Sequence, residues 1–143
     1  MTVELDAEGW PVRRDTSPLA QFLKVEQDGK GGCRVVLDPV HMSPNGTMHG
    51  GALFSMFDTA MGTAAAGRLP EGRLCVTMEV HIRYLKPTFD GEVEVTASVL
   101  NSGKRIIQTE ARAINRDSSG GERTVASATG SFVVIDRERP APA

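Results

Sequence analysis

Apolar residues recur between residues 52 and 66 with the spacing of one helical face. Gly67 and Pro70 follow this run, and both residue types commonly mark the end of a helix. The other side of the same helix carries small and apolar residues and one charge, Asp58, where a surface helix would carry several Lys and Glu. We therefore predict a long helix that is buried nearly all round. The positions of the first face are Ala52, Leu53, Met56, Phe57, Ala60, Met61 and Ala64.

Apolar and polar residues alternate in four stretches after this helix, which is typical of β-strands with one buried face. Turns rich in Gly, Asp, Asn and Ser separate the stretches. In the first stretch we expect the apolar side to lie on the helix and the polar side to face solvent or another subunit. Its apolar positions are Val76, Met78, Val80, Ile82 and Tyr84. The four stretches are residues 75–85, 92–100, 105–115 and 123–135.

The sequence ahead of the long helix predicts a short helix and a hairpin. Ser17 suits an N-cap and Pro18 the first helical position, so a short helix begins here and continues to about Phe22. The glycine-rich residues 28–32 then join two short strand-like runs. These runs are residues 23–27 and 33–38, and a loop over residues 39–48 leads into the long helix.

One long buried helix and a set of antiparallel strands predict an α+β fold, in which a curved sheet wraps around the helix. A chain of 143 residues suits one domain with a proper core. We expect an N-terminal arm over residues 1–17 and the single domain over residues 18–135. A disordered tail is expected over residues 136–143, where charge and proline are frequent.

The composition narrows the classes of partner. The chain is 40% hydrophobic and 24% charged with a net charge of −2, so no basic bias points to nucleic acid. No apolar run approaches about 20 residues and no secretory signal is visible, so we expect neither a membrane span nor export. Cys33 and Cys75 lie far apart and form no CxxC motif, which favours a reduced, cytoplasmic protein.

The start of the long helix is a candidate site for an anion. The first backbone N–H groups of a helix have no partner within it, and the helix dipole adds positive potential there. Gly50 and Gly51 would leave that end open to a ligand, because neither places a Cβ in the way. This pattern fits an oxyanion hole, although paired glycines also form simple tight turns.

Asp58 lies two turns further along the helix. A lone buried carboxylate costs several kcal/mol unless it is paired or hydrogen-bonded, and acids in such places cluster at functional sites. A structural role, in which Asp58 bonds a backbone amide or a basic side chain, and a catalytic role both fit the pattern at this point.

Residues 43–60 read SPNGTMHGGALFSMFDTA. This segment resembles the signature of the PaaI-like (phenylacetic acid degradation) acyl-CoA thioesterases of the thioesterase superfamily, which have the hotdog fold. In that family a His-Gly-Gly turn opens the central helix and an Asp follows nine residues after the His, as Asp58 follows His49 here. The similarity continues through residues 77–88 and covers roughly residues 18–135. It implies a curved antiparallel sheet wrapped around one long central helix.

The resemblance also implies a reaction, the hydrolysis of an aryl- or medium-chain acyl-CoA thioester to free acid and CoA. The Gly50 N–H would bind the thioester carbonyl and stabilise the oxyanion, and Asp58 would act as general base or as nucleophile. Thr77 would help to hold the attacking water, but is equally an ordinary strand residue. His49 would orient the loop through a hydrogen bond to the backbone in preference to titrating.

One position departs from the family pattern. Six residues before the His, the family has Asn, or Gln in a related branch, and its amide helps to hold the carbonyl or the water. Ser43 stands at that position, and Asn45 is two residues out of step. Ser43 can donate one hydrogen bond from a shorter reach, Asn45 can swing in, or a water can fill the gap.

The substrate would be held by cations and by an acyl pocket. CoA phosphates call for a few cationic or N–H donors, although each such charge can equally be a solvated one. The candidates for CoA are Arg83, Lys86, Gly103, Lys104 and Arg105, of which we favour the pair 104–105. Further candidate contacts are Asn45 and Gly51, and for the acyl pocket Phe54, Phe57, Met61 and Met78, which are core residues by default.

The family assembles at least as dimers, so we expect a homodimer or homotetramer with the active site at the subunit interface, where one subunit supplies Asp58 and the other Gly50. Two other functions stay open: a hydratase or dehydratase in which His49 works with Asp58, and a non-catalytic protein that binds acyl-CoA. The His-Gly-Gly order favours the thioesterase. We expect no metal and no cofactor, because His41, His49 and His81 have no acid cluster near them in sequence.

Overall fold

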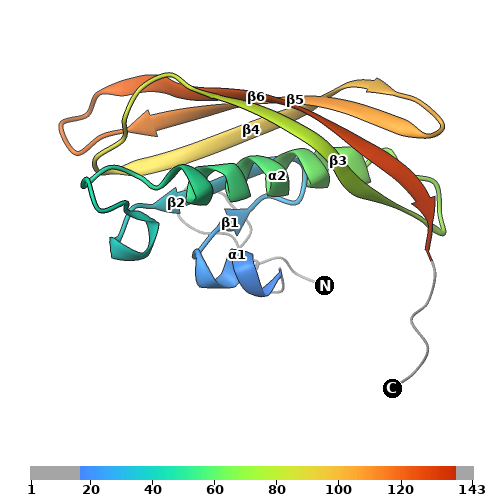
Figure 1. Cartoon of the computed structure of the whole chain (residues 1–143), viewed down its shortest axis with the longest axis horizontal. Helices are drawn as coiled ribbons and strands as arrows, with labels where there is room; N and C mark the ends of the chain where they lie inside the picture. Colours follow the sequence, from blue (N-terminus) through green and yellow to red (C-terminus); the bar gives the residue numbers. More distant parts are fainter. Residues whose placement is uncertain (1–16, 138–143) are drawn as a thin grey trace.

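The computed structural model describes residues 17–137, and the expected arm and tail lie outside this range except for Ser17, Asp136 and Arg137. Within the range, two helices, one 3₁₀ turn and six strands follow one another much as predicted (Figure 1). They are α1 (Pro18–Phe22), β1 (Glu26–Gln27), β2 (Gly32–Val36), the 3₁₀ turn (Pro39–His41), α2 (Gly50–Ala66), β3 (Arg73–Tyr84), β4 (Glu92–Ser102), β5 (Ile106–Arg116) and β6 (Glu122–Asp136).

The strands form one antiparallel sheet in the order β1-β2-β4-β5-β6-β3. The sheet curls around α2, which lies on its concave side (Figure 1). This arrangement confirms the predicted α+β architecture of a curved sheet around one long helix. The twelve-residue strand β3 forms one edge of the sheet, and no other strand of residues 17–137 pairs with its outer side.

The core lies between α2 and the sheet. Phe57 and Met61 are fully buried there, and burial of side chains of this size contributes about 1.5–3 kcal/mol each. The sheet supplies the other half of the core from residues that alternate along its strands. These include Val93, Val95, Ile107, Val125 and Phe132.

The side of α2 away from the sheet is more open than predicted. Phe54 is 37% exposed, and Asp58 and Gly62 are only half-buried. The prediction of a helix buried nearly all round is therefore wrong for the single chain. The physical reason is that one curled sheet covers only one side of a helix, and a face without charges has the same sequence pattern whether or not the chain covers it.

Strand β3 contains a β-bulge that changes which side chains face the helix. Thr77 pairs with Phe132 of β6 and Glu79 pairs with Ser131, so Met78 is the extra residue. Thr77 faces α2 before the bulge, and Val80, Ile82 and Tyr84 face the same side after it. Val76 and Met78, expected on the helix, are 45% and 52% exposed. The regular alternation assumed for this strand is wrong at its first two apolar positions.

Both cysteines are free thiols, as the sequence predicts: Cys33 is buried and Cys75 is half-buried. Burial raises the pKa of each thiol, so neither is a thiolate near neutral pH. No helix among residues 17–137 is long and apolar enough to cross a membrane.

Candidate active site

The loop before α2 is held by its own backbone. The Ser43 N–H donates to the Thr47 carbonyl at 2.7 Å, and the Gly46 N–H donates to the Ser43 carbonyl at 3.1 Å. Gly46 has a φ of 76°, a left-handed conformation that glycine adopts without strain. The Met48 N–H then donates to the Thr88 carbonyl at 2.8 Å. These bonds fix the point at which the chain enters the helix.

His49 is the N-cap of α2, and its Nδ1 accepts a hydrogen bond from the Gly51 N–H at 2.8 Å. The ring therefore carries its proton on Nε2, and it orients the helix start as a backbone cap. The same bond uses the Gly51 N–H, so Gly51 is not available as a donor to a ligand in this geometry. The sequence anticipates a role of this kind for His49.

His41 lies in the loop that the sequence predicts over residues 39–48, and it stabilises that loop through several hydrogen bonds. It is 1% exposed, and its backbone carbonyl accepts the His49 N–H at 2.7 Å. Its Nδ1 accepts from the Asp38 N–H, which leaves Nε2 to donate to the Leu23 carbonyl. A hydrogen bond from Lys24 lowers the pKa of Asp38, which caps the 3₁₀ turn. The signal was the Asp-x-x-His spacing of a capping box.

Gly50 is the first residue of α2, and its N–H has no acceptor among residues 17–137. This group lies where the helix dipole is positive. The Gly50 carbonyl accepts a hydrogen bond from the Tyr84 hydroxyl at 2.6 Å. A Cβ at position 50 would stand 3.3 Å from the Tyr84 ring, so the close contact suits glycine. No pattern in the sequence indicates this role of Tyr84, which the alternation of residues places only on an apolar strand face.

Asp58 lies near the middle of α2 and receives a hydrogen bond from the Thr77 hydroxyl at 2.7 Å. Among the described residues it accepts no other hydrogen bond and has no ion pair with a basic side chain. Among the described residues, Asp58 therefore makes neither the bond to a backbone amide nor the ion pair with a basic side chain that the structural alternative predicted. A half-buried carboxylate that keeps one oxygen free can accept a proton from a water molecule.

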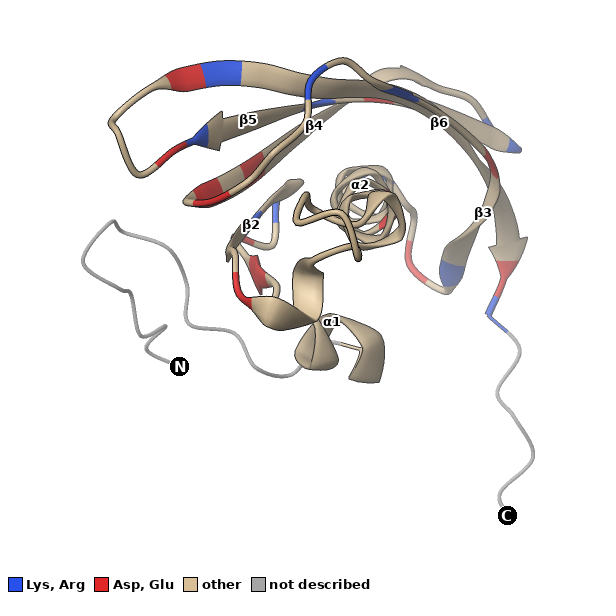
Figure 2. Cartoon of the chain, turned by 60° about the vertical axis from the view of Figure 1, so that its left-hand side comes forward, with Lys and Arg blue, Asp and Glu red and all other residues tan. Residues whose placement is uncertain are grey.

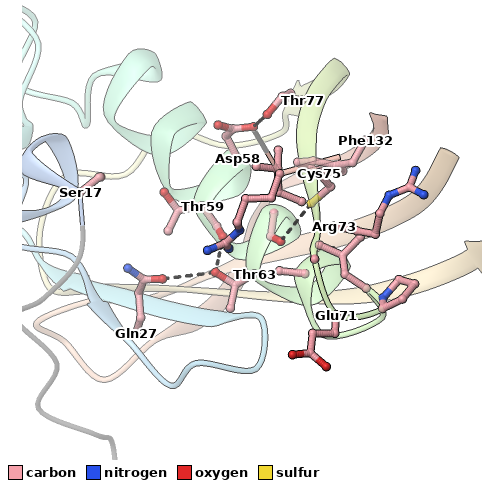
Figure 3. Close-up of a pocket in the computed structure, with 17 residues that line it drawn as sticks. Ser17, Gln27, Asp58, Thr59, Thr63, Glu71, Arg73, Cys75, Thr77 and Phe132 are labelled. Carbon is pink, nitrogen blue, oxygen red and sulfur yellow. Dashed lines mark hydrogen bonds between the residues drawn. The ribbon is translucent and has the colours of Figure 1, made fainter. Parts of the chain in front are cut away.

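A groove of about 940 Å³ opens beside Asp58 and Thr77. It follows the open side of α2 towards the end of the helix and the start of β3 (Figure 3). Its lining includes Gln27, Asp58, Thr59, Gly62, Thr63, Cys75, Thr77 and Phe132. Polar side chains supply part of this lining, although the sequence predicts apolar side chains for an acyl pocket. Leu69, Leu74 and Phe132 supply apolar surface.

None of the four acyl-pocket candidates lines this groove. Phe57 and Met61 are fully buried in the core, and Met78 points to the other side of β3 because of the bulge. Phe54 remains on the open side of α2. Figure 2 shows how little charge that helix carries, and Asp58 is the single charged residue of Gly50–Ala66.

The two predicted halves of the catalytic site lie apart within one chain. Gly50 and Asp58 are eight residues apart on a continuous helix, which corresponds to about 12 Å along its axis. Ser43 and Asn45 precede the helix, so the loop that carries them also lies at the Gly50 end. The Ser43 hydroxyl is 3.0 Å from the Thr47 hydroxyl, and Asn45 is exposed.

The candidate CoA contacts fall into two groups. Arg83 and Lys86 are exposed near the end of β3, and Arg83 borders a shallow hollow on the outer face of the sheet. Lys104 and Arg105 are exposed in the β4–β5 turn. Lys104 lines a hollow of about 350 Å³ together with Arg68 and Arg73.

This second hollow shares Leu69, Pro70 and Arg73 with the groove beside Asp58. Arg68, which follows the end of α2, was not anticipated from the sequence. The Gly103 N–H already donates to the Ile106 carbonyl at 2.9 Å, so it is not a free donor. Among residues 17–137, no group of three or more His, Cys, Asp or Glu side chains is placed to hold a metal ion.

Comparison with known proteins agrees with the family resemblance seen in the sequence. The sequence model of the thioesterase superfamily matches residues 45–122, more than half of the chain. A curated relative from Saccharolobus solfataricus, whose name describes it as a putative esterase, is 35% identical over 89 residues, or 62% of this chain and 56% of that protein. The chain spans about half the length of the curated relatives that it matches.

Two solved structures resemble the whole domain. The BH2602 protein of Bacillus halodurans, crystallised with CoA, is 35% identical with a TM-score of 0.75, over 86% of this chain and 79% of that one. The E. coli PaaI protein from the phenylacetic acid degradation operon is 25% identical with a TM-score of 0.71, over 85% and 86%. The chain has the hotdog fold, and it belongs to the thioesterase superfamily as a PaaI-like member.

Proposed function

We propose that this protein hydrolyses acyl-CoA thioesters to a free acid and CoA. The observation that carries the proposal is a pair of complementary groups on one helix: an N–H at Gly50 that has no acceptor among residues 17–137, and a carboxylate at Asp58 that opens on a groove. The Gly50 N–H suits the oxyanion of a tetrahedral intermediate, and the Asp58 carboxylate suits the attack on the thioester carbon. Membership of the thioesterase superfamily and likeness to a protein crystallised with CoA support the same reaction.

In the general-base form of the mechanism, Asp58 removes a proton from a water molecule as the water oxygen attacks the thioester carbon. The carbonyl oxygen becomes an oxyanion and accepts a hydrogen bond from the Gly50 N–H. The intermediate then collapses, the C–S bond breaks, and the thiolate of CoA takes up the proton. In the nucleophilic form, an Asp58 oxygen attacks the carbon directly and the C–S bond breaks as the CoA thiolate leaves. Water then hydrolyses the resulting anhydride, which restores the Asp58 carboxylate and releases the acid, and the thiolate takes up the proton. The Thr77 hydroxyl holds the carboxylate in either form, and neither form requires a cofactor.

The two groups act on one substrate only if they come from two chains. A separation of about 12 Å along α2 is too long for both groups of one chain to reach a single carbonyl. The structure offers two features to a second copy: the edge of β3 with which no strand of the described residues pairs, and the open, nearly uncharged side of α2. We therefore place the active site at the interface of a homodimer, in which Gly50 of one subunit faces Asp58 of the other.

The hollow between Arg68, Arg73 and Lys104 is the better place for the phosphates of CoA, because it adjoins the groove that contains Asp58. Arg83 and Lys86 lie near the opposite end of β3 and are the less favoured pair. Ser43, with its hydroxyl close to Thr47, steadies the loop at the Gly50 end and takes the place of the usual amide.

The test measures release of free CoA thiol from aryl- and alkyl-CoA esters. We expect Asp58→Asn to lower kcat by at least about a hundredfold. Gly50→Pro should have a similar effect, since it removes the N–H at the first helical position, where proline is tolerated, and His49 already has the extended conformation that precedes proline. The proline ring also adds a Cβ near Tyr84. Gly50→Ala is the matched control, because it adds a Cβ near Tyr84 and keeps the N–H.

Co-expression of the Asp58→Asn and Gly50→Pro chains tests the two-chain site directly. Half of randomly paired dimers are mixed and hold one intact site of two, so about a quarter of the wild-type rate should return. No recovery would place both groups in one chain. If wild type binds CoA esters without release of thiol, the non-catalytic alternative replaces the enzyme, and loss of an enoyl-CoA chromophore would indicate the hydratase.

A further inference from the structure

Two side chains that lie opposite each other in the sheet, Asn115 and Arg123, form a buried pair. Asn115 continues the buried alternation of β5 and is 1% exposed, and Arg123 of β6 is its direct partner in the strand pairing. The Asn115 Oδ1 and the Arg123 Nε are both buried, and neither has a hydrogen-bond partner among the residues that the structure describes. Such atoms are rare, because nearly every buried polar atom is bonded to protein or to ordered water.

The other bonds of the buried pair show which atoms are left over. The Asn115 Nδ2 donates to the carbonyls of Asp90 and Glu92, each at 3.0 Å. A half-turn of the carboxamide would place its oxygen against two carbonyl oxygens, so Oδ1 is the atom without a partner. The Arg123 Nη2 donates to the Pro87 carbonyl at 2.9 Å, and this bond does not use the Nε–H. One acceptor and one donor are therefore left close together inside the protein.

A single water molecule suits these two atoms. Residues directly opposite each other on neighbouring strands have Cβ atoms about 4.5–5.5 Å apart, so one small molecule can reach both side chains. A water molecule accepts from the Nε–H with its oxygen and donates to Oδ1 with one of its protons. An anion cannot donate to Oδ1, and a metal cation cannot accept from the Nε–H. The chemistry of the two atoms therefore selects water.

The buried pair also anchors the chain between β3 and β4. Its three bonds to carbonyls hold residues 87–92 against the sheet. Within this segment, Thr88 is 3% exposed, and its carbonyl accepts the Met48 N–H at 2.8 Å. Met48 lies two residues before Gly50 in the chain. The position of the Gly50 N–H therefore depends on residues 87–92, and these residues depend on the buried pair.

We propose that the Asn115 Oδ1 and the Arg123 Nε–H hold one buried water molecule between them. The bridged pair keeps residues 87–92 in place, and through Met48 it positions the Gly50 N–H for the oxyanion. Asn115 and Arg123 are positioning residues, since they act through this segment and not on the substrate. The catalytic part of the inference rests on the proposed thioesterase function and deepens it, whereas the binding of water follows from the buried pair alone.

A crystal structure at high resolution tests the water directly. We expect one ordered water within about 2.7–3.2 Å of both the Asn115 Oδ1 and the Arg123 Nε. Arg123→Lys keeps the charge and replaces the Nε–H by a methylene group, so the water should be absent from this variant. Direct contact between the two atoms in wild type, or an empty space between them, would overturn the water site.

Amide hydrogen exchange followed by NMR tests the positioning without any substrate. Arg123→Met and Arg123→Lys should each speed exchange of the Met48 amide by at least about tenfold, because its bond to the Thr88 carbonyl loses support. Arg112→Met, on an exposed position of β5, is the control for loss of an arginine and should exchange as wild type does. Unchanged exchange in both Arg123 variants would overturn the positioning. Unchanged exchange in Arg123→Lys alone would show that the charge acts and that the bridging water does not.

Release of CoA thiol measures the consequence for catalysis. Arg123→Met should lower kcat about tenfold and change KM by less than about twofold, because the Gly50 N–H acts mainly on the transition state. A rise in KM with kcat unchanged would overturn the link to the oxyanion. If wild type releases thiol from no ester, the proposed function fails, and the crystal structure and the exchange rates still decide the water and the positioning. Asn115→Leu provides the same comparisons if Arg123→Met does not fold.

Discussion

The two faces of α2 have similar compositions and different surroundings. Both are rich in small and apolar residues, and neither carries a Lys, Arg or Glu. The face with Phe57 and Met61 is fully buried against the sheet, whereas the face with Phe54, Asp58 and Gly62 stays partly open. Composition therefore does not distinguish a face that stabilises the fold from a face that forms a site. The two faces of α2 differ in whether the curved sheet packs against them.

The comparison predicts that substitutions on the two faces affect different measurements. Changes on the buried face should lower the free energy of unfolding and alter activity only through loss of folded protein. Changes on the open face should alter activity and leave the free energy of unfolding nearly unchanged.

The largest effect is expected for Phe57→Ala. The side chain is fully buried between α2 and the sheet, so its removal leaves a cavity and should lower the free energy of unfolding by about 3–5 kcal/mol. Urea unfolding followed by circular dichroism measures this change. Phe54→Ala, on the open face of the same helix, is the matched control and should cost much less in the monomer. Equal losses for the two variants would contradict the distinction between the faces.

A smaller effect is expected for Thr77→Val, which conserves shape and removes the hydroxyl that donates to Asp58. Hydrogen bonds to charged groups contribute about 1.5–3 kcal/mol, and exposure reduces that value here, so we expect kcat to fall about tenfold. The midpoint of unfolding should stay close to wild type. Thr77→Ser should retain most of the activity, and a Thr77→Ser variant as slow as Thr77→Val would show that the hydroxyl is not what matters.

The smallest effect concerns Gly62→Ala. Glycine inside a helix costs about 0.5–1 kcal/mol relative to alanine, and the new Cβ would make an ordinary contact of 3.4 Å with Phe132. The variant should therefore unfold at slightly higher urea concentration. Its methyl group also narrows the groove, so KM should rise for bulky acyl groups more than for acetyl-CoA. A variant that is less stable than wild type would show that the groove tolerates no side chain at position 62.

The sequence predicted the elements well where periodicity was long and regular. The apolar face of α2 and the alternation of β4, β5 and β6 depend on repeats of several residues, and these repeats reflect the dominant contribution of burial. Resemblance to a known signature then located His49, Gly50 and Asp58 on the central helix, and the structure places Thr77 against Asp58.

The sequence could not show features that depend on contacts between distant segments. The bulge at Met78 is set by the pairing of β3 with β6, and nothing in the local pattern signals it. Gln27 meets Thr63 across 36 residues, so neither residue suggests the other. The role of Tyr84 at Gly50 is hidden because a tyrosine fits an apolar strand face equally well.

The bulge also determines what kind of change this protein tolerates. Thr77 and Tyr84 are seven residues apart, and on a regular strand two such residues point in opposite directions. Here both reach α2, one at Asp58 and the other at Gly50, because one extra residue between them reverses the alternation. Over evolutionary time this segment should accept replacements of its residues far more easily than insertions or deletions. The number of residues between the two contacts should stay constant, while the residue types between them can change.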